Sequence, residues 1–293
     1  MEITINCAIV YCILSSPCDL GTYQGSTRNR RLHSVGSGEP RLTPQELGAL
    51  FVDFYSFMAT LNFNKSDLKI PPPTGWPEIT LESCGHVKSD YAVEVIRHLP
   101  YFENKGTTQF HYRSKVLDLR AWTPEDFKSH HETHDGYEFW SSEDEQDPSD
   151  VVCIAEGYGT AGRVLWLLVK DGEIIEHLNK VDLMSAVTVE DFFSNLGKEY
   201  ENLKLIPGEG RITIEAENVP KRKRRITEDE VNSQTEEWGT ELDIQYVRQI
   251  YRDHGWPHSF NFEAASRAIN TWLEPLDSGK EGSRGLGWEI AEW

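Results

Sequence analysis

The densest group of candidate metal ligands in this sequence lies between residues 130 and 135, where three histidines and two carboxylates occur within six residues. Imidazole and carboxylate together suit zinc or another transition metal. On a helix, His130 and His134 would share one face at a spacing of four residues, but their neighbours supply no apolar stripe that would bury a metal site. We therefore interpret the segment as a polar surface loop, keep His130 and His134 as the metal candidates, and expect no cofactor.

Proton-transfer chemistry would need histidines and carboxylates that the fold brings together. The candidates are scattered along the chain: Glu94, His98, Glu156 and His177. Nucleophilic chemistry has less support, because the sequence holds neither a Gly-x-Ser-x-Gly elbow nor a convincing Cys/His pair. Cys153 lies in an apolar run, where burial would raise the pKa of its thiol. Spacing alone does not show whether the four acid–base candidates meet.

The segment from Gly157 to Gly162 fits the Gly-x-Gly-x-x-Gly pattern of dinucleotide-binding loops. Such a loop needs a helix N-terminus to hold the pyrophosphate, whereas the residues after Gly162 are typical of a strand. The pattern therefore indicates a glycine turn rather than a nucleotide site.

An acidic run could bind a basic protein or a divalent cation. Its residues are Glu143, Asp144, Glu145 and Asp147. The run lacks the alternating ligands and central glycine of an EF-hand loop. This favours a flexible charged loop, and we expect these carboxylates to form a surface for a protein partner.

A basic run is the clearest linear signal in the sequence. It consists of Lys221, Arg222, Lys223, Arg224 and Arg225. Five consecutive cations suit the acidic groove of a nuclear import receptor or an RNA phosphate backbone. The simpler alternative is a solvated loop before the helix that Thr227 begins.

Composition limits the classes of partner. Lys and Arg number 29 against 48 Asp and Glu, which gives a formal charge of −19. Such a charge repels phosphate backbones and anionic lipids, so we do not expect nucleic acid as a general partner. No apolar stretch reaches the ~20 residues of a membrane-spanning helix. Five cysteines form no dense disulfide framework, which favours a reducing compartment, the cytoplasm or the nucleus.

The elements that must position these residues belong to one predicted domain, residues 42–275, between a mobile extension (1–41) and a loose tail (276–293). Hydrophobic periodicity and capping signals predict the following order. Helices are expected from Thr43 to about Leu61, from Ser89 to Leu99, from Thr188 to about Tyr200, from Thr227 to His254 and over Phe262–Leu273; extended segments are expected at Phe110–Leu119, Val151–Ala155, Arg163–Val169, Glu173–Leu178, Leu203–Pro207 and Arg211–Ala216; and a surface loop is expected over Lys128–Asp150.

Asp171 and Gly172 are typical of a two-residue hairpin turn, so the sheet is expected to be mainly antiparallel. Helices near both ends of the domain then flank this sheet. The arrangement predicts an α+β fold rather than a doubly wound parallel one.

Residues 150–203 resemble the SUKH superfamily, a fold of cell-wall-synthesis regulators and toxin-immunity proteins. The likeness rests on a strand that ends at Glu156-Gly157, the strand from Val164 to Val169, the Asp171-Gly172 turn, a return strand to His177, and a capped helix with Phe192-Phe193. The family's usual aromatic and glycine-rich loop is not found. The resemblance implies protein binding through an acidic surface, as a regulatory scaffold or an inhibitor. The wider sequence, including Lys88-Ser89-Asp90-Tyr91 and Tyr251–Pro257, is similar to uncharacterised proteins of filamentous fungi, which implies a lineage and no activity.

Two hypotheses for function follow. The first is a non-enzymatic interaction or regulatory module of SUKH-like type that binds a protein partner. The second is a metal-independent biosynthetic enzyme, a cyclase or isomerase, which takes a small-molecule substrate into an aromatic pocket with a carboxylic acid as proton donor. A deep aromatic cavity with a desolvated carboxyl would favour the enzyme, and a filled core would favour the binding module.

Overall fold

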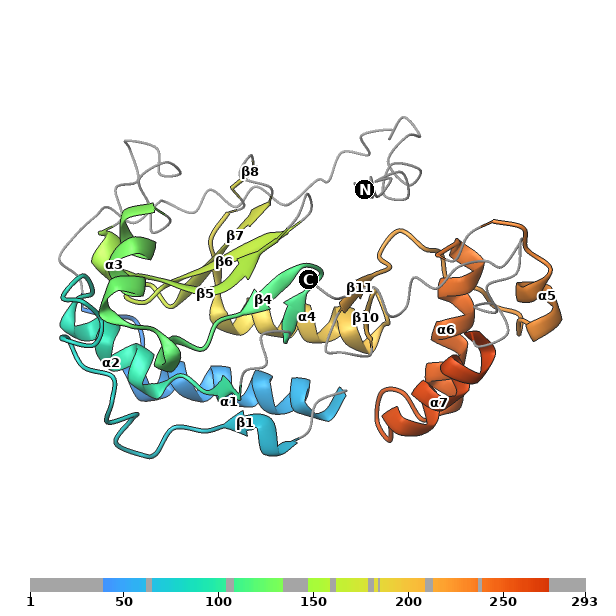
Figure 1. Cartoon of the computed structure of the whole chain (residues 1–293), viewed down its shortest axis with the longest axis horizontal. Coiled ribbons are helices and arrows are strands. Elements are labelled where there is room, and N and C mark those ends of the chain that lie inside the picture. The colour runs from blue at the N-terminus through green and yellow to red at the C-terminus, as the bar shows by residue number, and fades with distance from the viewer. Residues whose placement is uncertain are drawn as a thin grey trace, which may run out of the picture. The chain divides into compact units, whose positions relative to one another are not determined.

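An antiparallel sheet with helices against one face forms the centre of the structure, a computed structural model (Figure 1). It describes residues 39–61, 65–103, 108–133, 147–158, 162–178, 182–183, 185–208, 213–236 and 239–273. All of them lie in the unit that begins at Ser37. The expected extension and tail lie almost entirely outside these ranges.

Within the described ranges, seven strands make up the main sheet, and every pairing in it is antiparallel. Their order is β3 (Gln109–His111), β4 (Ser114–Val116), β5 (Val151–Gly157), β6 (Arg163–Leu168), β7 (Glu173–Leu178) and β8 (Asp182–Leu183), while β9 (Val187–Thr188) also pairs with β7. Two further pairs are β1 (Leu68–Lys69) with β2 (Tyr101–Phe102), and β10 (Leu205–Pro207) with β11 (Thr213–Glu215).

The helices of the described ranges complete an α+β fold, as the sequence predicts. They are α1 (Pro44–Leu61), α2 (Asp90–His98), α3 (Pro124–Thr133), α4 (Val189–Glu201), α5 (Glu228–Asn232), α6 (Glu241–Asp253) and α7 (Phe262–Leu273), with short 3-10 turns at Lys65–Asp67, Leu119–Ala121 and Pro148–Asp150. None of these helices is long and apolar enough to cross a membrane.

The hairpin unit β5 to β7 confirms the strongest prediction from the sequence. β7 spans the predicted residues, β5 continues two residues further to Gly157, and β6 ends one residue earlier at Leu168. Leu168 pairs with Glu173, so four residues connect the two strands instead of the expected two. Gly172 closes this loop at a φ of 61°, a conformation that glycine adopts without a steric penalty.

The two faces of the hairpin follow the strand alternation of side chains. Val152, Ile154, Leu165, Leu167 and Ile174 belong to the main core together with α1 and α4. The alternate residues form a second buried cluster on the opposite face: Val151, Cys153, Trp166, Leu168 and Ile175. Both faces of the central strands are therefore apolar, which explains why these strands read as nearly continuous hydrophobic runs.

Helices α1 and α4 begin where the sequence places them. Thr43 and Glu46 form the expected capping box, because the Glu46 N–H donates to Thr43 Oγ1 at 3.2 Å and the Thr43 N–H donates to Glu46 Oε2 at 2.8 Å. Thr188 caps α4 by accepting the Asp191 N–H at 3.2 Å. The aromatic stripe of α1 is core packing: Phe51 and Phe54 both contact Phe193 of α4.

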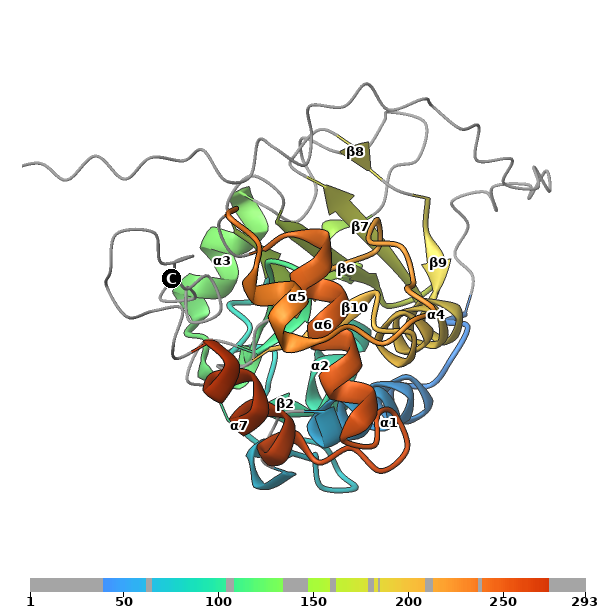
Figure 2. The same ribbon diagram turned by 90° about the vertical axis from the view of Figure 1, so that its right-hand side faces the viewer.

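Helices α5, α6 and α7 lie together beyond the small β10–β11 pair in Figure 1 and face the viewer in Figure 2. Arg248 of α6 joins them to the rest of the core, since its guanidinium donates to the carbonyl oxygens of Leu203 (2.9 Å), Ala216 (2.5 Å) and Val219 (2.7 Å). Tyr251 also donates to the Pro207 carbonyl, and Trp256 Nε1 donates to Glu201 O at 3.0 Å. The predicted helix Phe262–Leu273 is confirmed at both ends.

Three expectations about local structure are wrong. The loop predicted over Lys128–Asp150 begins with helix, since α3 continues to Thr133. The strand predicted over Phe110–Leu119 is two strands, because Arg113 adopts a φ of 53° and reverses the chain between β3 and β4. The helix predicted from Thr227 to His254 is two helices, α5 and α6, because Thr240 forms a second capping box with Asp243.

Candidate functional site

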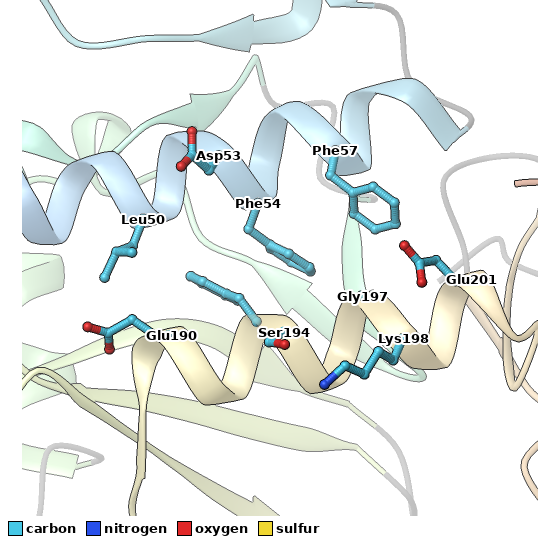
Figure 3. Close-up of a pocket in the computed structure, with 10 residues that line it drawn as sticks. Leu50, Asp53, Phe54, Phe57, Glu190, Ser194, Gly197, Lys198 and Glu201 are labelled. Atoms are coloured by element: carbon cyan, nitrogen blue, oxygen red, sulfur yellow. The ribbon is translucent and has the colours of Figure 1, made fainter. Parts of the chain in front are cut away.

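A groove of about 450 Å³ runs between α1 and α4 (Figure 3). The two helices run side by side in the same direction, so that Leu50 lies near Glu190 at one end and Phe57 lies near Glu201 at the other. Its lining comes from every third or fourth residue of each helix: Leu50, Asp53, Phe54 and Phe57 from α1, and Glu190, Phe193, Ser194, Gly197, Lys198 and Glu201 from α4.

The floor of the groove is aromatic and firmly packed. Phe54 and Phe193 stack at 4.4 Å with an angle of 5° between their ring planes. Phe54 also meets Phe110 of β3 edge to face at 5.7 Å, and Phe51 meets Phe193 edge to face at 4.9 Å. Because aromatic pairs with these geometries resist rearrangement, the floor is an apolar surface fixed from below.

The rim of the groove is acidic. Asp53, Glu190 and Glu201 are exposed, and Lys198 is the one cation among the described residues that line the groove. Glu190 is joined to Arg41 at 2.8 Å, and this hydrogen bond lowers the pKa of the Glu190 carboxyl. The rim therefore presents water-accessible carboxylates above an apolar floor.

Gly197 opens the groove at its centre. A Cβ atom placed on this glycine would meet no atom within 4 Å, so the absence of a side chain is not required by packing inside the protein. Glycine in a helix interior costs roughly 0.5–1 kcal/mol relative to alanine. Its effect here is to leave open space over the backbone of α4 beside Lys198 and Ser194.

The chemistry of this groove suits binding better than proton transfer. A carboxylic acid that donates a proton near neutral pH needs a desolvated site that raises its pKa. The three carboxylates of the groove are exposed to water, and the pKa of Glu190 is lowered instead. The groove can bury apolar side chains of a ligand and attract basic ones.

A second polar cluster lies at the end of the sheet, around His111 of β3. Burial and the nearby Arg163 hold the pKa of His111 well below its usual value, while burial and Glu217 raise the pKa of Glu199. His111 Nε2 lies 3.9 Å from Glu199 Oε2. Arg163 pairs with Glu176 and, at 2.7 Å, with Glu215. This cluster joins a neutral imidazole to a carboxyl that holds its proton more tightly than usual.

The four acid–base candidates from the sequence do not form one site. Glu94 and His98 lie on α2, where His98 Nδ1 is 2.8 Å from the Glu94 carbonyl oxygen and Glu94 pairs with Arg97 at 2.6 Å. His177 is buried on β7 and stacks on Trp166 at 5.6 Å. Glu94 and His98 thus contact groups of their own helix, and His177 contacts an aromatic ring on β6.

Glu156 and His130 come together although the sequence did not predict it. His130 is buried on α3 against Trp122, and its Nε2 lies 3.6 Å from Glu156 Oε1 on β5. His134 lies outside the described residues. Among the residues that the structure does describe, no group of three His, Cys, Asp or Glu side chains could hold a metal ion.

The acidic run can be followed at one position only. Glu143, Asp144 and Glu145 lie outside the described residues, and Asp147 caps the 3-10 turn before β5 by accepting the Ser149 N–H at 2.9 Å. This backbone hydrogen bond lowers the pKa of Asp147. Asp147 thus has a local structural role.

Ion pairs hold the basic run against the chain, while Lys221, Lys223, Arg224 and Arg225 remain exposed. Glu230 accepts hydrogen bonds from Arg222 at 2.9 Å and from Arg224 at 2.6 Å, and Asp253 accepts from Arg225 at 2.6 Å. A linear import signal would have to break these ion pairs to enter a receptor groove.

Sequence reasoning found neither the groove nor the His111 cluster. Asp53, Glu190 and Glu201 are ordinary exposed carboxylates in their own helices, and only the pairing of α1 with α4 brings them to one groove. One signal was present in the sequence. Gly197 lies in the middle of a strongly amphipathic helix, where glycine is unfavourable, and such a glycine often indicates a packing or functional requirement.

No family model, curated protein or solved structure matches this chain.

Proposed function

We propose that this chain is a non-enzymatic protein-interaction module of regulatory type that acts in the cytoplasm or nucleus and binds its partner in the α1–α4 groove. The partner supplies apolar side chains for the apolar lining and basic side chains for Asp53 and Glu201 on the rim, since Glu190 already pairs with Arg41. The groove carries this proposal, because an apolar trough between two helices with charged edges is how proteins receive an amphipathic helix. We also propose that residues 150–203 are related to the SUKH superfamily, whose members bind proteins.

An acidic surface still binds the partner in this proposal. It lies on the rim of the α1–α4 groove, whereas the sequence placed it at residues 143–147. The overall charge of −19 draws a basic partner toward the chain, and the carboxylates of the rim select it at close range. The half-buried Leu50 and Phe57 contribute the affinity, because burial of apolar area is the larger favourable term in such interfaces and Phe54 and Phe193 are only 5% and 7% exposed.

The test uses a variant that fills the groove without disturbing the core. Helical peptides displayed on phage are selected on the wild-type protein and measured again on Gly197→Trp, which has room for a side chain. Asn195→Trp places the same residue at an exposed position of α4 outside the groove lining and is the matched control. We expect selected peptides to carry Lys or Arg beside Leu, Phe or Trp, and to lose at least about ten-fold in affinity on Gly197→Trp alone.

Peptides that bind Gly197→Trp and the wild type equally would refute the groove as the binding site. Selection of peptides without basic residues would refute the role of the rim. The double reversal Asp53→Lys with Glu201→Lys should weaken binding of the selected peptides and reduce its salt dependence, since both carboxylates are exposed.

A second candidate function rests on the His111 cluster. The raised pKa of Glu199 beside a neutral His111 is the arrangement that a proton-transferring enzyme would need, and it favours the metal-independent cyclase or isomerase hypothesis. NMR titration of the Glu199 carboxyl tests the premise. A pKa of Glu199 at or below the ordinary 4.5 would remove the support for this hypothesis.

A further inference from the structure

A basic depression of about 260 Å³ lies between residues 221–226 and helix α6. The run of five cations supplies one wall, and α6 supplies the other. The α6 residues are Gln245, Arg248, Gln249, Arg252 and Asp253. The tertiary structure thus adds two arginines, Arg248 and Arg252, to the linear run.

The local charge of this depression is opposite to that of the whole chain. Seven cationic side chains line it, and the carboxylates that pair with them are Asp253 and Glu230, so five positive charges remain in excess. The chain as a whole carries −19. A concentrated patch of this kind creates a strong local potential, since exposed charges are screened only beyond about 8 Å at physiological salt.

The ion pairs hold the depression in shape. Arg222 and Arg224 both bind Glu230, while Arg225 makes two hydrogen bonds to Asp253, at 2.6 and 3.0 Å. Ile226 is buried below them, and its N–H donates to Gln249 of α6 at 2.8 Å. The 221–225 segment is therefore fixed against α6 before any ligand arrives, which reduces the entropy cost of binding.

Four of these seven cations pair with no carboxylate in the part of the chain that the structure describes, and one of them, Lys221, donates to Asn202 Oδ1 at 2.9 Å instead. Lys223 and Arg252 are exposed, and Arg248 is only 2% exposed with its guanidinium bonded to backbone carbonyls. Arg248 and Arg252 lie one helical turn apart and repel each other; burial first, and then Arg252, lower the pKa of Arg248. A bound anion would relieve this repulsion.

We propose that this depression binds a compact oligophosphate, a chain of two or more phosphate groups, with Lys223 and Arg252 as its direct ligands. Guanidinium and ammonium groups are the usual partners of phosphate oxygens, and several phosphates are needed to match five excess charges. A long nucleic acid fits less well, because it would extend from this patch over the acidic remainder of the chain. The site is separate from the α1–α4 groove and does not depend on the function proposed for it.

The test is calorimetric titration of the full chain with tripolyphosphate, and with ATP to distinguish a nucleotide from an inorganic source. The double variant Lys223→Ala with Arg252→Ala removes the proposed ligands. Lys128→Ala with Arg267→Ala removes the same charge from two positions elsewhere and is the control. We expect the first variant to weaken binding by at least about ten-fold and the second by less than about two-fold. Lys223, Arg252 and Arg267 are exposed and Lys128 is half-buried, so both variants should fold, and circular dichroism checks this.

Several results would overturn the proposal. They are the absence of binding by both oligophosphates, an equal loss in both variants, and equal affinity for single phosphate or sulfate, which would show an adventitious ion only. Binding of a short RNA that requires Lys223 and Arg252, without binding of either oligophosphate, would also reject it in favour of a nucleic-acid surface.

Discussion

Gly48 of α1 lies directly against the carbonyl oxygen of His98 at the end of α2, so close that a Cβ atom on Gly48 would overlap with it. The contact brings the two helices together and holds α1 in the position from which it forms one wall of the groove. The neighbouring atoms are backbone, which cannot move aside as a flexible side chain would. This glycine is therefore required by packing, whereas Gly197 on the other wall is not.

The two glycines should respond with opposite signs to the same substitution. Gly48→Ala is expected to destabilise the fold by about 1–3 kcal/mol, because overpacking separates α1 from α2. Gly197→Ala is expected to stabilise it by about 0.5–1 kcal/mol, because alanine favours the helix and the site has free space. Urea denaturation of the two variants beside the wild type measures both. A loss of stability in Gly197→Ala would contradict the open groove.

His111 should make the fold sensitive to acid. Burial and Arg163 keep the pKa of folded His111 well below the 6.5 of an unfolded imidazole. Between these two pKa values the unfolded chain binds more protons, so this contribution to stability is complete above 6.5 and is lost as the pH falls. His111→Gln should reduce the loss of stability between about pH 7 and pH 5, measured by urea denaturation.

His258→Gln removes an exposed imidazole and is the matched control for this experiment. Glu199 contributes in the opposite direction. Its raised pKa means that its contribution is present at low pH and is lost as the pH rises above 4.5. An identical pH profile in His111→Gln and the wild type would contradict the lowered pKa of folded His111.

Arg248 should act as a structural connector as well as a wall of the basic depression. Arg248→Met would leave the carbonyl oxygens of Leu203, Ala216 and Val219 without their guanidinium donor. Each lost partner costs about 1–3 kcal/mol where water cannot replace it. We expect faster amide hydrogen exchange in α6 and α7, with the β5–β7 strands unchanged. Arg252→Met, one turn away and exposed, should leave exchange as in the wild type; faster exchange in both variants would contradict the connector role.

The cap at Thr240 should stabilise α6 separately from α5. Thr240 Oγ1 accepts the Asp243 N–H at 3.2 Å and donates to Gln234 at 2.7 Å. Thr240→Ala is expected to cost about 1 kcal/mol, within the range of 0.5–2 for a lost N-cap, measured by thermal unfolding. The same change at Thr227, which caps the five-residue α5, should cost less because it releases fewer contacts. A larger cost at Thr227 than at Thr240 would contradict this expected order of the two caps.

Local signals in the sequence were sufficient for most of the elements. The hairpin β5–β7, the start of α1 at Thr43, the cap of α4 at Thr188 and both ends of α7 follow from turn chemistry, caps and periodicity, which depend on neighbouring residues. The predictions that failed also have local causes. The last turns of α3, which bury His130, were predicted as a loop because their residues are polar. The break before Thr240 was missed because the apolar stripe continues across it.

The sites were decided by tertiary structure alone. Asp53 and Glu201 are separated by 148 positions of sequence numbering, and nothing in either helix predicts that they flank one groove. Arg248 and Arg252 join the basic run only because α6 packs against residues 221–226. By itself, the sequence determined the charge, the fold class and the local elements, because these depend on composition and on residues within a turn or two. The juxtaposition of distant side chains depends on which helices pack together, and core packing chooses that through contacts between residues far apart in the chain.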